Sequence, residues 1–267
     1  MKVIKMQAYG NDYCLIEHKP NLDYEKLAIK ICNRNLGVGG KGLIVVKIMP
    51  NLEMFLYDFS GKRQSMDTNA LMCFSKYVVE NDLIRKKSFD VICSNTKYNI
   101  TVDNDGYILN LGAPNYNNSM LHISDSISSF GRALKLSDGN LVTIYSLYLG
   151  DIETIVIVDD LCDSIINKKD MIINNILFKN KTNVHFVKII DKGNILIKSY
   201  DKFGNYIKSS LGGAASALSA LNKMKLTFKK INVEFELGNI KVELIKDKAL
   251  ICGNSHKVFE CEYKEED

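Results

Sequence analysis

The chain has 267 residues, and 46% of them are hydrophobic, which is enough for a sizeable core and argues against intrinsic disorder. Its net charge of +4 is mild, and the Lys and Arg residues form no long block, so nucleic acid is not expected as a partner. No apolar run approaches the roughly 20 residues of a membrane-spanning helix, so no membrane partner is expected either.

The cysteines and histidines indicate a reduced, metal-free protein. The seven cysteines show no close pairing in sequence, and the N-terminal stretch MKVIKMQAYG turns polar too early for a signal peptide. We therefore expect reduced thiols and a cytoplasmic location. The four histidines are isolated, with no CxxC or HxxxH pattern, so each is expected to be a surface or packed residue rather than a metal ligand.

A glycine-rich stretch near the N-terminus fits a nucleotide-binding pattern but stands in the wrong context. Residues 37–42 match GxGxxG, yet a helical pattern over 24–35 precedes them and a strand pattern follows. A dinucleotide fingerprint requires the reverse order, with the strand first and the helix after. Nucleotide binding is therefore not expected, and Lys41 in this turn is expected to be solvated.

The chain repeats itself at an offset of about 143 residues. Residues 53–78 and 196–221 share one pattern when Tyr57 is set on Tyr200: an alternating strand, a glycine turn, a short strand and a capped amphipathic helix. Strand patterns precede both segments, and a three-strand meander with tight turns follows each of them. The sequence therefore predicts two copies of one β-rich unit.

The predicted fold class is α+β, with two pseudo-symmetric β-rich halves, each a curved sheet or barrel around a central helix. The central helices are expected over 68–80 and 210–223, with Asp67 and Ser210 as their caps. The predicted domains are an N-terminal half over 1–115, with the tail 257–267 packing on it, and a C-terminal half over 116–256.

The two helix starts are expected to face each other across a cleft. Their free N–H groups and dipoles favour an anion such as a carboxylate. Asp67 and Ser210, one from each half, would then flank the carbon beside that carboxylate. Such an arrangement suits the transfer of a proton from one face of the carbon to the other, with these two residues as acid and base.

The motifs along nearly the whole chain resemble those of diaminopimelate epimerase and its relatives, the cofactor-independent amino-acid epimerases and racemases. The matching stretches are KMQAYGNDYCLIE (5–17), ICNRNLGVGGKGLIVV (31–46), YDFSG and MDTNALMCFSKYV (57–78), LNLGAP (109–114), YLGDIETIVIVDD (148–160), TNVHFVKI (182–189) and YDKFGNYIKSSLGGAASA (200–217). The resemblance implies the epimerase-type fold, no cofactor, an amino-acid-like small-molecule ligand and a place in lysine or peptidoglycan precursor metabolism.

The family's two catalytic cysteines are replaced in this chain. Asp67 stands at the position of the first and Ser210 at that of the second, so the resemblance makes them the catalytic positions. It also implies a set of substrate-binding positions, namely Asn11, Asp58, Thr68, Asn69, Asp151, Asn183, Asp201, Lys202, Leu211 and Gly212. Glu153 stands where the family has a histidine, and no histidine is expected beside Ser210.

These replacements change the expected chemistry. A carboxylate, with a reference pKa of about 3.9, is a much weaker base than a thiolate of about 8.5, and a serine hydroxyl needs a separate base. Two-thiol racemisation is therefore not expected. Asp58, Asp67, Asp151 and Glu153 add up to four acidic groups to the site, which disfavours a carboxylate ligand and could attract a cation or polyamine.

Three functional alternatives stay open from the sequence. The chain could be an isomerase with a different acid/base pair, resembling the phenazine-biosynthesis-type isomerases that move protons with carboxylates. It could be a non-catalytic relative that binds a ligand or pairs with an active copy, since Asp and Ser are also good helix caps. The third alternative is a conventional diaminopimelate epimerase. The resemblance leaves both a homodimer and a heterodimer with an active relative open as assemblies.

Overall fold

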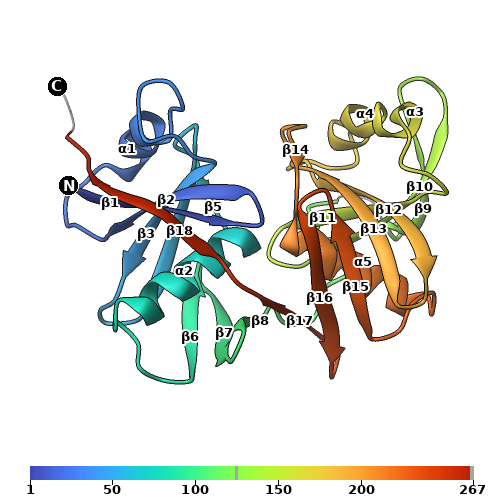
Figure 1. Ribbon diagram of the computed structural model, residues 1–267. Coiled ribbons are helices and arrows are strands. Elements are labelled where there is room, and N and C mark those ends of the chain that lie inside the picture. Colours follow the sequence, from blue (N-terminus) through green and yellow to red (C-terminus); the bar gives the residue numbers. More distant parts are fainter. Residues whose placement is uncertain (124–125, 265–267) are drawn as a thin grey trace. The chain divides into compact units, whose positions relative to one another are not determined.

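The computed structural model of the chain describes residues 1–123 and 126–264. It divides into two compact units, Met1–Asn110 with Cys252–Asp267, and Leu111–Ile251 (Figure 1). The division lies a few residues before the predicted boundaries at 115 and 256. Among the described residues, no helix is both long and apolar enough to cross a membrane.

The first unit is a mixed sheet with two helices. Its elements are β1 (Lys2–Ala8), β2 (Asn11–Glu17), α1 (Tyr24–Ile31), β3 (Gly42–Lys47), β4 (Glu53–Asp58), β5 (Arg63–Gln64), α2 (Thr68–Glu80), β6 (Ser88–Cys93), β7 (Thr96–Asp103), β8 (Gly106–Asn110) and β18 (His256–Glu262). The strands run in the order β18, β1, β2, β3, β4, β6, β7 and β8, and β5 pairs with β4. The pairs β2–β3 and β4–β6 are parallel, and the others are antiparallel.

The second unit repeats this order. Its elements are β9 (Phe130–Lys135), β10 (Leu141–Tyr148), β11 (Ile152–Ile157), α3 (Asp163–Ile166), α4 (Lys169–Ile173), β12 (Asn183–Asp191), β13 (Asn194–Tyr200), β14 (Tyr206–Ile207), α5 (Leu211–Lys223), β15 (Lys230–Phe235), β16 (Gly238–Ile245) and β17 (Lys248–Gly253). The pairs β11–β12 and β13–β15 are parallel, as are their counterparts β2–β3 and β4–β6 in the first unit. The predicted internal repeat and fold class are confirmed.

The pairing registers match the two units residue by residue. Tyr13 pairs with Gly42 across the parallel strands of the first unit, and Glu153 pairs with Asn183 in the second. Leu43 pairs with Tyr57, and Val184 with Tyr200. It follows that Tyr13 and Glu153 hold equivalent places, as do Ile44 and His185 one residue further along β3 and β12.

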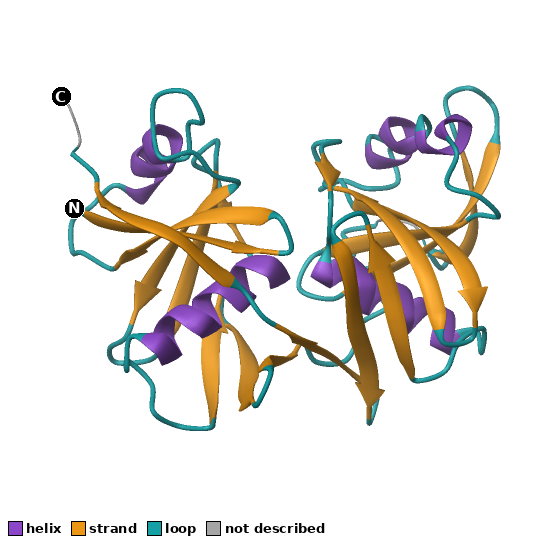
Figure 2. Cartoon of the chain, viewed as in Figure 1, coloured by secondary structure: helices purple, strands orange, loops and turns teal. Residues whose placement is uncertain are grey.

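Each unit encloses one central helix in its strands (Figure 2). The helix α2 buries its N-terminal residues from Thr68 to Ser75, and α5 buries every residue from Leu211 to Leu221. The run of glycine and alanine at the start of α5 keeps the helix thin, which allows the strands to approach it closely. Burial on all sides holds each helix start in a fixed position.

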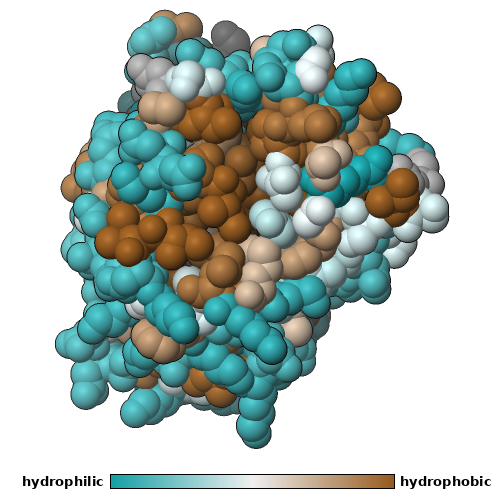
Figure 3. Space-filling model, turned by 90° about the vertical axis from the view of Figure 1, so that its right-hand side faces the viewer, coloured by the Kyte–Doolittle hydropathy of each residue, from teal (hydrophilic) through white to brown (hydrophobic). Residues whose placement is uncertain are grey.

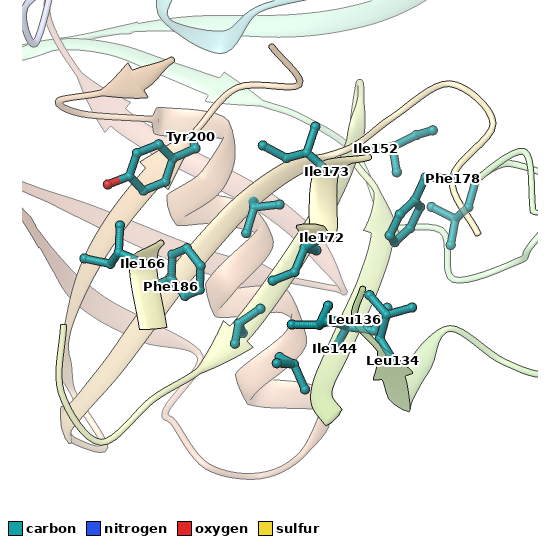
Figure 4. Packing of buried hydrophobic residues seen from close by; sticks show 14 of the residues in the cluster. Leu134, Leu136, Ile144, Ile152, Ile166, Ile172, Ile173, Phe178, Phe186 and Tyr200 are labelled. Carbon is teal, nitrogen blue, oxygen red and sulfur yellow. The ribbon is translucent and has the colours of Figure 1, made fainter. Parts of the chain in front are cut away.

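Apolar side chains fill the space between the sheet and the outer helices. In the second unit, residues of α3, α4 and strands β9 to β13 form one buried cluster that includes Leu134, Ile144, Ile172 and Phe186 (Figure 4). In the first unit, α1 buries Leu27 and Ile31 against strands β2 and β3. The outer helices are short and amphipathic, as expected for elements with one face on a core.

Candidate functional site

The start of α2 is built around the side chain of Asp67. Its backbone is extended, and its Oδ1 accepts hydrogen bonds from the backbone N–H groups of Asn69 at 2.8 Å and Ala70 at 3.1 Å. These bonds satisfy two of the four N–H groups that a helix start leaves without a partner. One carboxylate oxygen therefore anchors the helix, while the other is directed to a different partner.

That partner is Lys41, whose Nζ lies 2.8 Å from Oδ2 of Asp67. The same Nζ lies 3.4 Å from Oδ1 of Asn11, the first residue of β2. The Lys41 and Asp67 side chains are 29% and 22% exposed, so the pair is accessible without being fully solvated. The expectation that Lys41 is merely solvated was wrong, because the turn before β3 brings it to the α2 start.

Asp67 is ionised in this setting. Burial on its own would raise the pKa of the carboxyl, but the charge and hydrogen bond of Lys41 and the N–H group of Ala70 together hold the pKa below its ordinary value. Tyr13 lies nearby, and its pKa is raised well above the usual value by burial and by the negative charge of Asp67. Its phenol is therefore neutral.

The other predicted positions of the first unit fall into two groups. Asn69 is buried and donates from Nδ2 to the carbonyl oxygen of Ala8 at 3.1 Å, which ties the first turn of α2 to the end of β1. Thr68 is also buried beside it. Oδ1 of Asp58 accepts hydrogen bonds from the N–H groups of Ser60 and Lys62 in its own turn, and Oδ2 accepts from Nε2 of Gln64. The structure therefore gives Asp58 a turn-forming role.

The start of α5 carries Ser210 at the matching cap. Its Oγ accepts a hydrogen bond from the N–H of Gly213 at 3.1 Å, and the residue is 8% exposed. Leu211 and Gly212 follow as the first buried residues of the helix. The side chain of Leu211 is fully buried, so it packs into the core of the unit.

A buried polar chain lies beneath this first turn. Nε2 of His185 lies 2.6 Å from Oε2 of Glu153, and Nδ1 lies 2.8 Å from Oγ of Ser199. All three residues are at most 5% exposed. A Cβ added to Gly213 would stand 2.4 Å from the His185 ring and 3.0 Å from Oγ of Ser210. The expectation that no histidine lies beside Ser210 was therefore wrong.

A second ion pair lies at the strand ends of the same sheet, between the residue before β11 and a residue that follows β13. Nζ of Lys202 lies 3.0 Å from Oδ2 of Asp151, and the backbone N–H of Lys202 donates to Oδ1 of Asn183 at 3.0 Å. Asp201 accepts from the N–H groups of Phe203 and Asn205, so it forms the turn before β14. The repeat places this turn where the first unit has the turn of Asp58.

Three of the four predicted acidic residues have a basic or imidazole partner within their own unit. Asp67 pairs with Lys41, Asp151 with Lys202 and Glu153 with His185. The attraction of a cation or polyamine stays a prediction from the sequence. Among the described residues, no three His, Cys, Asp or Glu side chains are placed to hold a metal ion.

The sequence reasoning missed Lys41, Tyr13, His185 and Ser199. A signal was present for the last two, because the repeat sets them on Ile44 and Leu56, which are apolar and buried in the first unit. Polar residues at core positions of only one copy indicate a specific polar contact. Nothing in the local sequence links Lys41 to Asp67, which lies 26 residues further along the chain.

Comparison with known proteins gives one set of relatives. No protein-family model matches the chain. The diaminopimelate epimerase of Caldanaerobacter subterraneus subsp. tengcongensis is 29% identical over 270 residues, covering 97% of this chain and 98% of the relative. The crystal structure of a Bacillus anthracis phenazine biosynthesis protein of the PhzF family matches with a TM-score of 0.71 at 15% identity, covering 99% of each chain. A probable proline racemase from Agrobacterium radiobacter K84 matches with a TM-score of 0.75 at 11% identity, covering 99% of this chain and 93% of the other.

These findings confirm the resemblance to diaminopimelate epimerases that the motifs predicted. The curated relatives cover nearly the whole chain, and the solved structures share its fold. The relatives indicate an isomerase of the epimerase type.

Proposed function

We propose that this chain is an isomerase that moves a proton on an amino-acid-like carboxylate substrate, with Asp67 as its single ionised acid/base group. The observation that supports this most directly is the 2.8 Å ion pair between Lys41 and Asp67 at the start of α2. A base must be within reach of the substrate and deprotonated at the working pH. Asp67 is partly exposed, and its lowered pKa keeps it ionised.

The matching position of the second unit has no comparable base. Ser210 is a hydroxyl whose Oγ already accepts from Gly213, and the ring nitrogens of His185 are engaged by Glu153 and Ser199. A serine without a base at hydrogen-bond distance does not ionise near neutral pH. Two-thiol epimerisation is thus not expected of this chain. The repeat predicts that Asp67 and Ser210 act on one substrate, and this stays a prediction.

A single weak base restricts the substrate. The proton affinity of an aspartate is lower than that of a cysteine thiolate by about 4–5 pKa units. The C–H group must therefore be more acidic than that of a free amino acid, for example through a neighbouring double bond or imine. Lys41 compensates the charge of Asp67, so a substrate carboxylate meets no net repulsion there.

The names of the relatives supply the first candidates. Diaminopimelate, the substrate in the names of the curated relatives, is the first compound to test, which would place the chain in lysine or peptidoglycan precursor metabolism. Unsaturated carboxylates of the kind expected for a phenazine-type proton shift are the second. The chemistry argued above favours the second class, because a carboxylate base suffices for it.

A non-catalytic role is the competing function. The side-chain oxygens of Asp67 and Ser210 both accept capping hydrogen bonds from backbone N–H groups, which is a sufficient structural reason for their presence. The ion pair with Lys41 supports the catalytic role, since capping requires only one oxygen of Asp67 and no cation.

Proton exchange in D2O tests the proposal. The wild-type chain is incubated with diaminopimelate and with a panel of unsaturated amino and dicarboxylic acids, and loss of the C–H signal is followed by NMR. Asp67→Asn keeps a capping side chain and removes the base, while Ser210→Ala is the matched variant at the other helix start. We expect exchange by wild type and Ser210→Ala, and a loss of at least about 100-fold in Asp67→Asn. No exchange with any compound would favour the non-catalytic role.

A further inference from the structure

The second unit carries a groove whose lining includes none of the residues predicted for the candidate site. It runs between β9 with the residues that follow it, 132–137, and α4 with the loop after it, 170–179. Its volume is about 970 Å³. Small-molecule sites in proteins span about 300–1,000 Å³, so the groove is large enough for a ligand. Figure 3 shows apolar side chains gathered around a hollow on this side of the unit.

The floor of the groove is apolar. Leu134 and Leu136 are 4% and 3% exposed and belong to the buried cluster of the unit (Figure 4). Met171 and Leu177 pack against the same cluster from the α4 side. At the wall, Ile176 is 99% exposed, which leaves an entire isoleucine side chain in water. A ligand with an apolar body would cover it and gain about 25 cal/mol for each Å² removed from water.

The rim of the groove is basic. Arg132, Lys135 and Lys179 line it, and Asp170 is its one acidic residue. Asp170 is itself compensated, because its Oδ2 lies 2.7 Å from Nζ of Lys169. The groove therefore combines an apolar floor with a positive rim. A neutral apolar molecule would bring these cations no counter-charge, whereas an anionic head would complement them.

We propose that this groove binds a small amphiphilic anion, a molecule with an apolar body and one carboxylate head, of the class of medium-chain carboxylic acids. The apolar body of the ligand lies over Leu134, Leu136 and Ile176, and its carboxylate contacts Lys135 and Lys179. The site is separate from the start of α5 and does not rest on the proposed isomerase activity. Ligand binding in the groove and proton exchange at the candidate site can therefore succeed or fail independently.

Calorimetric titration with dodecanoate, below its micelle concentration, tests the proposal on the full chain. We expect saturable binding of one molecule per chain. The double variant Lys135→Glu/Lys179→Glu reverses the charge of these two rim residues, and Ile176→Asp places a carboxylate in the apolar wall. Each should weaken binding at least about tenfold, since like charges now face the head. Both substitutions are at exposed positions, so folding is expected to survive, and circular dichroism checks this.

The matched control is Lys241→Glu/Lys248→Glu, which changes the net charge equally at exposed positions of the same unit outside the groove. It should bind dodecanoate within about twofold of wild type, and uncharged dodecanol should bind wild type at least about tenfold more weakly. Equal affinity in the groove variants and the control, equal binding of dodecanol, or no saturable binding up to about 1 mM would overturn the proposal.

Discussion

Nζ of Lys41 lies 2.8 Å from Oδ2 of Asp67, while Oδ1 of the same carboxylate caps the first turn of α2. The two oxygens of Asp67 thus have separate partners, one structural and one charged. A residue that only caps a helix needs the first, and a base held ionised beside a substrate pocket needs both. The first prediction concerns this second partner.

Replacing Lys41 by Met should move the acid limb of the exchange activity to higher pH. Lys41 is the strongest influence that lowers the pKa of Asp67 against the effect of burial, so its removal raises that pKa. An opposite charge at this distance lowers a carboxyl pKa by about 1–3 units, and the limb should shift upward by a similar amount. The pH profile of exchange from pH 3 to pH 8 measures it. If the acid limb falls at the same pH in wild type and Lys41→Met, Asp67 is not the titrating base.

The stability of the chain should depend on Asp67 in a defined pH window. The pKa of Asp67 is lowered in the folded state, so its ionised form contributes stability above the unfolded value of about 3.9. That contribution is lost as the pH falls through the folded pKa. Urea unfolding should therefore show wild type more stable than Asp67→Asn by roughly 1 kcal/mol at pH 7, with the difference shrinking below about pH 4. A difference that grows on acidification would contradict the assigned charge state.

Glu153→Ala should destabilise the second unit. The substitution leaves Nε2 of His185 buried with no partner, and an unsatisfied buried polar group costs about 1–3 kcal/mol. Glu153→Gln retains an acceptor at the same place and should lose less than half as much. Chemical denaturation of the two variants gives the comparison. Equal stability of wild type and Glu153→Ala would show that the 2.6 Å contact contributes nothing.

Gly213→Ala should be destabilising because of His185. The added Cβ would stand 2.4 Å from two atoms of the imidazole ring, so either the ring or the first turn of α5 must move. Overpacking of this kind costs about 1–3 kcal/mol. In a double-mutant cycle with His185→Ala, most of the cost of Gly213→Ala should disappear, and the 3.0 Å approach of the Cβ to Oγ of Ser210 should account for the remainder. A cost that is independent of residue 185 would place the strain elsewhere.

Much of the fold followed from local patterns in the sequence. The central helices begin and end at the predicted residues within one position, because Asp67 and Ser210 are strong caps and the apolar stripe behind each is unambiguous. The first helix stops at Ile31, earlier than the predicted 35, and the backbone closes into a series of turns around Asn33. These turns are what bring Lys41 to α2.

The candidate site was predictable only in part. Capping residues can be recognised in the sequence. Asp58 and Asp201 were expected at substrate-binding positions, and the structure shows that both accept hydrogen bonds within turns. The pairs Lys41–Asp67 and Glu153–His185 depend on which parallel strands lie side by side and in which register. Such contacts join residues 26 and 32 positions apart, and no local pattern encodes them.

The stereochemical course of proton exchange tests the single-base account most directly. Deuterium content and configuration at the reacting carbon are followed together in D2O, for wild type and Asp67→Asn, with each compound that exchanges. One base removes and returns the proton on the same face. The account predicts that wild type incorporates deuterium without inverting the carbon, and that Asp67→Asn does neither. Inversion coupled to every exchange event, at a rate that Asp67→Asn leaves unchanged, would contradict it.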